Sequence, residues 1–224
     1  MIAPCGQAIW QVISIYALAS AADVTAKPQS LDYVQSAALP HVTLTAWQAL
    51  YELANLSKGQ TVLIHGAAGG VGHVAVQLAK LREAKVIGTA SVNYDLLESL
   101  DVDMAINYAT TAFENIVHDV DVVLDTIGND VQQRSWSTLK PGGILISTIQ
   151  QPSEEIAAEH GVRQAMVFTN PPIAQTLTEV ARLVDAGQIK PVVSVVHPLQ
   201  AVQQAHQIVD SKHTRGKVVL EVVK

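Results

Sequence analysis

The sequence predicts an α/β fold, in which a parallel sheet is doubly wound with helices on both of its faces. Short apolar, β-branched runs alternate along the chain with helical patterns, which is typical of parallel strands joined by helical crossovers. One of these runs is continuously apolar and ends in a cluster of glycines, as expected for a strand buried on both faces. Hydrophobic residues make up 49% and charged residues 15% of the 224 residues, so the chain has ample material for a packed core.

The glycine cluster at 66–72 lies between an expected strand at 61–65 and an expected helix that continues to Lys80. It is Gly-Ala-Ala-Gly-Gly-Val-Gly, and the helix after it has apolar side chains on one face at three- and four-residue steps. A strand, a glycine turn and a helix in this order indicate a site for a dinucleotide, because the helix N-terminus attracts the pyrophosphate. The sequence therefore predicts a Rossmann dinucleotide-binding fold.

The glycines of this turn are expected to serve different purposes. Gly66 lets the chain turn sharply off the strand, and Gly72 lets the helix pack closely on the sheet. Gly69 and Gly70 lack the Cβ atoms that would keep a pyrophosphate away from the backbone. The predicted phosphate loop consists of Ala68, Gly69, Gly70, Val71 and Gly72.

The remaining elements follow from the same alternation. Two short helical patterns broken at Pro40 come before the first strand. Further strands are expected at 85–89, 104–108, 120–124, 144–148 and 165–168, and helices at 95–100, at 131–139 and from Pro171-Pro172 to Gly187. Lys140-Pro141-Gly142-Gly143 is expected to separate the second of these helices from its strand. Two β-rich runs at 192–196 and 217–223, with a helix at 200–209 between them, need a sheet partner.

Composition excludes several classes of function. The net charge of −6, with no cluster of Lys and Arg, argues against a nucleic-acid partner. The single cysteine, Cys5, excludes an intramolecular disulfide, and the eight histidines do not follow a ligand spacing, so no metal is expected. The apolar stretch at 8–22 lacks the basic segment with which export signals begin, and it is too short to span a bilayer. We therefore expect no membrane association and a cytoplasmic location.

Five motifs together resemble the medium-chain dehydrogenase/reductase superfamily, in its zinc-independent quinone reductase-like branch. They are the Ala-Ala-Leu-Pro run at 37–40 with Leu-Thr-Ala-Trp at 44–47, the glycine turn at 66–72, and the segments at 121–128, 139–143 and 213–217. The resemblance covers the chain from about Tyr16 to its end. It departs from the family at 82–84 and 100–103, where the family tends to keep a glycine.

The resemblance implies an N-terminal, GroES-like substrate domain, of which only the exit segment is expected here. The chain is accordingly predicted to divide into a residual, β-rich substrate-domain fragment at 1–33, the dinucleotide-binding domain at 34–190, and a C-terminal β-α-β segment at 191–224 that normally returns to the substrate domain. Those last two strands also offer an edge for pairing in a homodimer.

The end of the second strand predicts NADPH ahead of NADH as the cofactor. An NAD site usually places Asp or Glu there to bond the ribose hydroxyls, whereas residues 89–93 are neutral. Ser91 and Asn93 can donate to a 2′-phosphate. Tyr108 matches the adenosine-side residue that the resemblance implies, although an ordinary strand-end aromatic is the alternative reading.

The nicotinamide is expected across the carboxyl ends of the later strands, near 126–129, 147–150 and 168–170. The predicted contacts there are Ser147, Thr148 and Phe168. Asp125 can be read as a general base or as a strand-end hydrogen-bonding group, and the second reading is favoured. No catalytic residue is identified.

The chemistry that the resemblance implies is hydride transfer from NADPH to a quinone or an α,β-unsaturated carbonyl, without zinc. The Tyr-x-x-x-Lys pair of short-chain reductases, the phosphate loop of nucleotide triphosphatases and the Gly-x-Ser-x-Gly of serine hydrolases do not occur. The alternative function is a dinucleotide-binding module with little or no turnover, because most of the substrate domain is missing.

Overall fold

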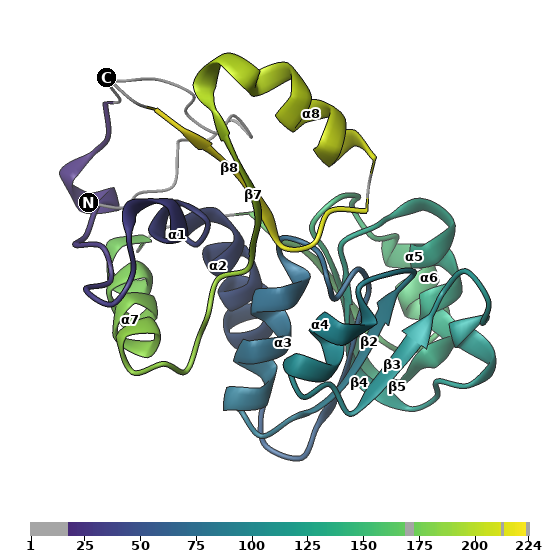
Figure 1. The fold of residues 1–224 in the computed structure, drawn as a ribbon. Coiled ribbons are helices and arrows are strands. Elements are labelled where there is room, and N and C mark those ends of the chain that lie inside the picture. Colours follow the sequence, from purple (N-terminus) through teal and green to yellow (C-terminus); the bar gives the residue numbers. More distant parts are fainter. Residues whose placement is uncertain (1–17, 169–172, 212, 223–224) are drawn as a thin grey trace. The chain divides into compact units, whose positions relative to one another are not determined.

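The computed structural model describes residues 18–168, 173–211 and 213–222, and the chain divides into two compact units (Figure 1). One unit is Thr45–Phe168, and the other combines Met1–Leu44 with Thr169–Lys224. The boundary at Leu44 falls inside helix α2 (Pro40–Trp47), which begins at the proline that separates it from α1 (Tyr33–Ala37). The predicted domain boundaries at 33 and 190 come from the family resemblance. A division of the chain into compact units does not test them, so they stay predictions.

The unit Thr45–Phe168 is built on a parallel sheet of six strands, which confirms the predicted fold class. The strands lie in the order β3-β2-β1-β4-β5-β6, and every neighbouring pair is parallel. Their bounds are β1 Thr61–Ile64, β2 Lys85–Ala90, β3 Met104–Asn107, β4 Val120–Asp125, β5 Leu139–Ser147 and β6 Arg163–Met166. The winding direction reverses between β1 and β4, and at such a point the carboxyl ends of the strands form a crevice for ligands.

Helices cover the sheet on both of its faces (Figure 1). They are α3 (Gly72–Leu81) and α4 (Tyr94–Ser99) on one side, and α5 (Asn129–Ser135) and α6 (Glu154–Glu159) on the other. Two short 3₁₀ turns, η3 (Phe113–Asn115) and η4 (Trp136–Thr138), complete the second layer, and a π-helical turn, η2 (Gln48–Leu53), packs on α3. Trp136 and Phe113, each 1% exposed, are the largest side chains of the core between this layer and the sheet.

Three predicted elements in this unit have boundaries that are wrong by more than one residue. The helix predicted at 131–139 is divided into α5 and η4, and Leu139 already belongs to β5. The Lys-Pro-Gly-Gly segment does not precede β5 but lies within it as a bulge, because Val120 pairs with Leu139 while Val122 pairs with Ile144. Gly142 takes φ +78° there. The sixth strand begins at Arg163 rather than at 165, and it ends at Met166, the residue that pairs with the last residue of β5.

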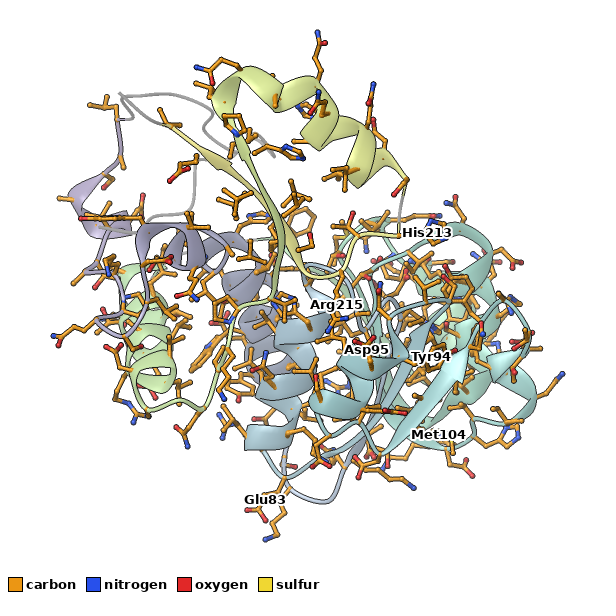
Figure 2. All side chains as sticks on the ribbon, viewed as in Figure 1. Glu83, Tyr94, Asp95, Met104, His213 and Arg215 are labelled. Carbon is orange, nitrogen blue, oxygen red and sulfur yellow. The ribbon has the colours of Figure 1, made fainter. Side chains whose placement is uncertain are left out.

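The two segments in which the sequence lacks the glycine of the resembled family, 82–84 and 100–103, each contain a residue with left-handed backbone. Glu83, between α3 and β2 (Figure 2), has φ +54°, and Asp101, between α4 and β3, has φ +57°. Side chains other than glycine rarely adopt this conformation. Asp103 stabilises the second turn, since its carboxylate accepts from the Val86 N–H at 2.7 Å and from Lys80 Nζ at 3.2 Å.

In the other unit the C-terminal strands pair with each other. β7 (Val193–Pro198) and β8 (Lys217–Glu221) form a parallel two-stranded sheet joined by η5 (Leu199–Ala201) and α8 (Val202–Asp210), so each supplies the partner that the sequence requires of the other. The unit also contains η1 (Ala21–Asp23) and α7 (Ile173–Asp185), and Asp185 accepts hydrogen bonds from the Ser30 N–H and Oγ. The predicted start of α7 at Pro171-Pro172 lies outside the described residues.

Candidate functional site

The glycine turn after β1 is fixed by close packing at both of its ends. Gly66 has φ +67°, and a Cβ on it would lie 2.8 Å from Thr126 Oγ1. A Cβ on Gly72 would lie 2.2 Å from the Gly66 carbonyl oxygen and 2.7 Å from the Ala67 Cα. Both positions therefore require glycine: Gly66 for the sharp turn, as expected, and Gly72 for close packing against the turn itself rather than against the sheet. A Cβ on Gly69 would also crowd the Gly66 carbonyl oxygen, at 3.1 Å, so that glycine has an internal reason besides any ligand.

Helix α3 presents an N-terminus suited to an anion. No side chain caps it, and its first turn contains no acidic residue. The unpaired N–H groups and the dipole of such a turn favour a negative group. His73 ties the helix back to the turn, because its Nδ1–H donates to the Gly69 carbonyl at 2.9 Å. An uncapped helix N-terminus without acidic residues is compatible with the role predicted for the loop, and the assignment of Ala68 to Gly72 to the pyrophosphate stays a prediction.

The predicted ribose contacts come together at the ends of β2 and β3. Ala90 pairs with Asn107, so Ser91 and Tyr108 occupy the next positions along neighbouring strands, and the Tyr108 N–H donates to the Ala90 carbonyl at 3.2 Å. Tyr108 is 47% exposed. Residues 91–93 carry no charge, and the predicted preference for a cofactor with a 2′-phosphate depends on this neutrality.

The sequence reasoning missed Tyr94 at this position (Figure 2). Its hydroxyl donates to the Ala90 carbonyl at 3.0 Å. Burial, and after it the neighbouring Tyr108, raises the pKa of the Tyr94 phenol above its ordinary value. The two tyrosines therefore lie together beside the end of β2. Only its place as the first residue of the helix after the second strand could have indicated Tyr94.

Asp125, at the end of β4, is a structural hub, as the favoured reading expected. One carboxylate oxygen accepts from the N–H groups of Ile127 at 2.9 Å and Gly128 at 2.8 Å. The other accepts from Gln132 Nε2 at 3.1 Å and Ser147 Oγ at 3.0 Å. A fully buried carboxylate with four donors holds the turn after β4 and is not placed to take a proton from a substrate.

The three predicted nicotinamide contacts differ in exposure. Ser147 is fully buried, and its hydroxyl also accepts from the Ile149 and Gln150 N–H groups at 3.2 Å each. Thr148 is partly exposed, and its N–H donates to the Asp125 carbonyl at 3.0 Å. Phe168 follows β6 and is 62% exposed. Thr148 and Phe168 are open to a ligand, whereas the Ser147 hydroxyl is committed to the turn; all three assignments stay predictions.

Exposed apolar side chains lie after β4 and β5. Ile127 is 46% and Ile149 58% exposed, and a Cβ on Gly128 would lie 3.2 Å from Ile149 Cγ2. Gln150 braces the same turn, since its side-chain oxygen accepts from the Asn129 N–H at 3.1 Å. The carboxyl ends of β4 and β5 thus offer an apolar surface held by backbone hydrogen bonds. Such a surface suits a flat ring better than a charged group.

Residues 18–168, 173–211 and 213–222 contain neither a candidate metal site nor a candidate membrane-spanning helix. In that part of the chain no group of three or more His, Cys, Asp or Glu side chains is arranged to hold a metal ion. Within the same ranges no helix has the length and hydropathy to cross a membrane. Cys5 lies outside the described residues, and the predicted absence of zinc stays a prediction.

Comparison with known proteins places this architecture among oxidoreductases. Residues 100–220 match the family described as zinc-binding dehydrogenase. The mitochondrial NAD(P)H oxidoreductase RTN4IP1 of Danio rerio is 30% identical over 93% of this chain and 62% of its own length. The quinone oxidoreductase of Coxiella burnetii superposes with a TM-score of 0.86 and 34% identity over 92% of this chain and 66% of its own. The CurK enoyl reductase gives 0.84 and 29%, over 92% of this chain and 67% of its own.

Proposed function

We propose that this chain binds NADPH and reduces a quinone or an α,β-unsaturated carbonyl without zinc. The proposal starts from its family: the chain belongs to the zinc-type alcohol dehydrogenase and quinone oxidoreductase group of the medium-chain dehydrogenase/reductase superfamily. The observation that carries the proposal is the uncapped N-terminus of α3 behind a turn that Gly66 and Gly72 fix by close packing. Relatives named NAD(P)H oxidoreductase, quinone oxidoreductase and enoyl reductase support the cofactor class and the two kinds of acceptor.

The residues of this chain fit the proposed cofactor. The pyrophosphate would be held by the N–H groups of the loop from Ala68 to Gly72, and the adenosine side by Ser91 and Tyr108. The nicotinamide, which supplies the hydride when the cofactor is bound, would lie over the apolar edge near Ile149. The chain's part in the reaction is binding and orientation, since Asp125 is occupied by four hydrogen bonds and no side chain is assigned to proton transfer.

The preference for NADPH over NADH is tested at Ser91. Ser91→Asp places a negative charge where the 2′-phosphate of NADPH would lie and an acceptor beside the free hydroxyl of NADH, so the order of affinities should reverse. The measurement is titration of both cofactors against both proteins, followed by cofactor fluorescence. Ser137→Asp, at an exposed hydroxyl in η4, adds the same charge elsewhere and should leave the order unchanged. Tighter NADH than NADPH binding by the wild type would refute the preference.

A second candidate is a dinucleotide-binding module with little turnover. The chain spans 62% to 67% of the lengths of the three proteins compared, so their whole activity does not transfer to it by similarity alone. NADPH oxidation with small quinones and enones, measured together with mass in solution, separates the two candidates. Turnover that follows the bound fraction of NADPH supports the reductase, and binding without turnover supports the module.

Assembly and location complete the proposal. We propose a homodimer formed by pairing at strand edges, and the same mass measurement tests it. We also propose a cytoplasmic location, although the Danio rerio relative is named as mitochondrial. Metal analysis of the purified chain should find no stoichiometric zinc.

A further inference from the structure

A buried chain of polar groups runs from the glycine turn to helix α5. Its centre is His65, the residue after β1, which is 1% exposed. His65 Nδ1 lies 3.2 Å from Thr89 Oγ1, and Nε2 lies 2.9 Å from Ser135 Oγ. The Gly66 N–H donates to Thr89 Oγ1 at 3.3 Å, and Ser135 Oγ donates to the Val131 carbonyl at 2.6 Å. Neither His65 nor Thr89 has a role in the proposed function so far.

The direction of every proton in this chain of groups can be assigned. Since the Ser135 hydroxyl gives its only proton to a carbonyl, it must accept from His65 Nε2–H. The neutral imidazole then has only an acceptor at Nδ1, to which the Thr89 hydroxyl donates. That leaves the Thr89 oxygen to accept from Gly66, so all the bonds point the same way and each group is satisfied.

His65 is neutral because of its surroundings. Burial is the main cause that lowers its pKa, from 6.5 to about 4; Asp125 and Glu114 raise the value and Arg134 lowers it. A neutral ring is the only form that can both donate to Ser135 and accept from Thr89. A T-shaped contact with Phe113, at 4.5 Å between ring centroids, further fixes its orientation.

We infer that Thr89 and His65 are positioning residues for dinucleotide binding, which hold the first residue of the glycine turn in the orientation that aims the following N–H groups at the pyrophosphate. Two further bonds act on the same short segment. The Ala67 N–H donates to the Thr89 carbonyl at 3.0 Å, and Thr126 Oγ1 donates to the His65 carbonyl at 2.8 Å. The turn is thereby attached to β2, β4 and α5 before a ligand arrives, which lowers the ordering cost of binding. The inference rests on the proposed function.

The test removes the hydroxyl at position 89 without changing the volume. Thr89→Val leaves the Gly66 N–H and His65 Nδ1 without partners. NADPH titration by fluorescence at pH 7.5, with urea unfolding to confirm that the protein is folded, should show a Kd raised about tenfold. Thr89→Ser restores the hydroxyl and should bring the Kd back to within about twofold of the wild type. The matched control is Thr43→Val, a fully buried hydroxyl that donates to Leu39, which should lose stability but not affinity.

A second variant acts from the far end of the network. Ser135→Ala removes the acceptor of His65 Nε2–H and should raise the Kd about threefold, so it carries the test if Thr89→Val does not fold. Wild-type affinity in either folded variant would overturn the inference. If the wild type itself does not bind NADPH, the proposed function fails. Amide exchange of Gly66, expected to be about tenfold faster in Thr89→Val, then still decides whether the network holds the turn, and unchanged exchange would overturn it.

Discussion

Left-handed glycines at the two ends of the parallel sheet differ in how closely they are packed. At the carboxyl end, Gly66 and Gly128 have φ +67° and +78°, and a Cβ on either would meet another side chain, at 2.8 Å and 3.2 Å. At the amino end, Glu83 and Asp101 take φ +54° and +57°. Gly161, which leads into β6 at φ +63°, has nothing within 4 Å of the position where a Cβ would lie.

The comparison separates two constraints on a left-handed residue. One is the backbone conformation itself, and the other is the packing of neighbouring atoms around the Cβ position. A side chain at the amino end costs the strain of a left-handed residue, about 1 kcal/mol, because there is room for it. At the carboxyl end, a side chain added at Gly66 would also displace the turn that is proposed to hold the cofactor. Gly66 and Gly128, at the end of the sheet that carries the candidate site, are thus sterically blocked against substitution, whereas Gly161 at the other end is not.

The largest effect is expected at Gly72. Gly72→Ala places a Cβ 2.2 Å from the Gly66 carbonyl oxygen, which is backbone and cannot move without opening the turn. We expect a loss of about 3 kcal/mol or more in the free energy of unfolding, measured with urea. Gly161→Ala, at the opposite end of the sheet, should lose only about 1 kcal/mol. Equal losses would show that the two ends do not differ.

A pH effect of similar size is expected from His65. Its pKa is about 4 in the folded chain and 6.5 when unfolded, so its contribution to stability is complete above pH 6.5 and is lost as the pH falls toward 4. The full loss amounts to about 3 kcal/mol. Urea unfolding across this range should show a smaller dependence on pH for His65→Leu than for the wild type. Identical pH profiles would mean that His65 is not held neutral.

The smallest effect is a gain in stability at the amino end. Glu83→Gly should relieve the left-handed strain and stabilise the chain by about 1 kcal/mol, reduced by the loss of an exposed ion pair with Lys58. Glu83→Ala removes the same ion pair but keeps a Cβ at positive φ, so it should bring no gain. Thermal unfolding of the two variants measures the difference, and a gain from alanine would contradict the role of strain.

The sequence sufficed for the order of the elements and for the strand, glycine turn and helix at 61–81, since both depend on local patterns. Alternating apolar runs indicated all six parallel strands, and the glycine spacing indicated Gly66 and Gly72. It did not suffice for features that depend on register. The bulge in β5 and the bond between Thr89 and the Gly66 N–H arise from how neighbouring strands align, which no local pattern encodes.

The most direct test of the central claim is to map NADPH onto the backbone amides of the isotope-labelled chain by NMR. We predict saturable chemical-shift changes concentrated at the carboxyl end of the sheet, in the loop from Ala68 to Gly72 and at Ser91 and Tyr108. The amides of the amino-end turns at 82–84 and 100–103 should not shift. Absence of saturable changes, or changes that are largest in those amino-end turns, would contradict the account.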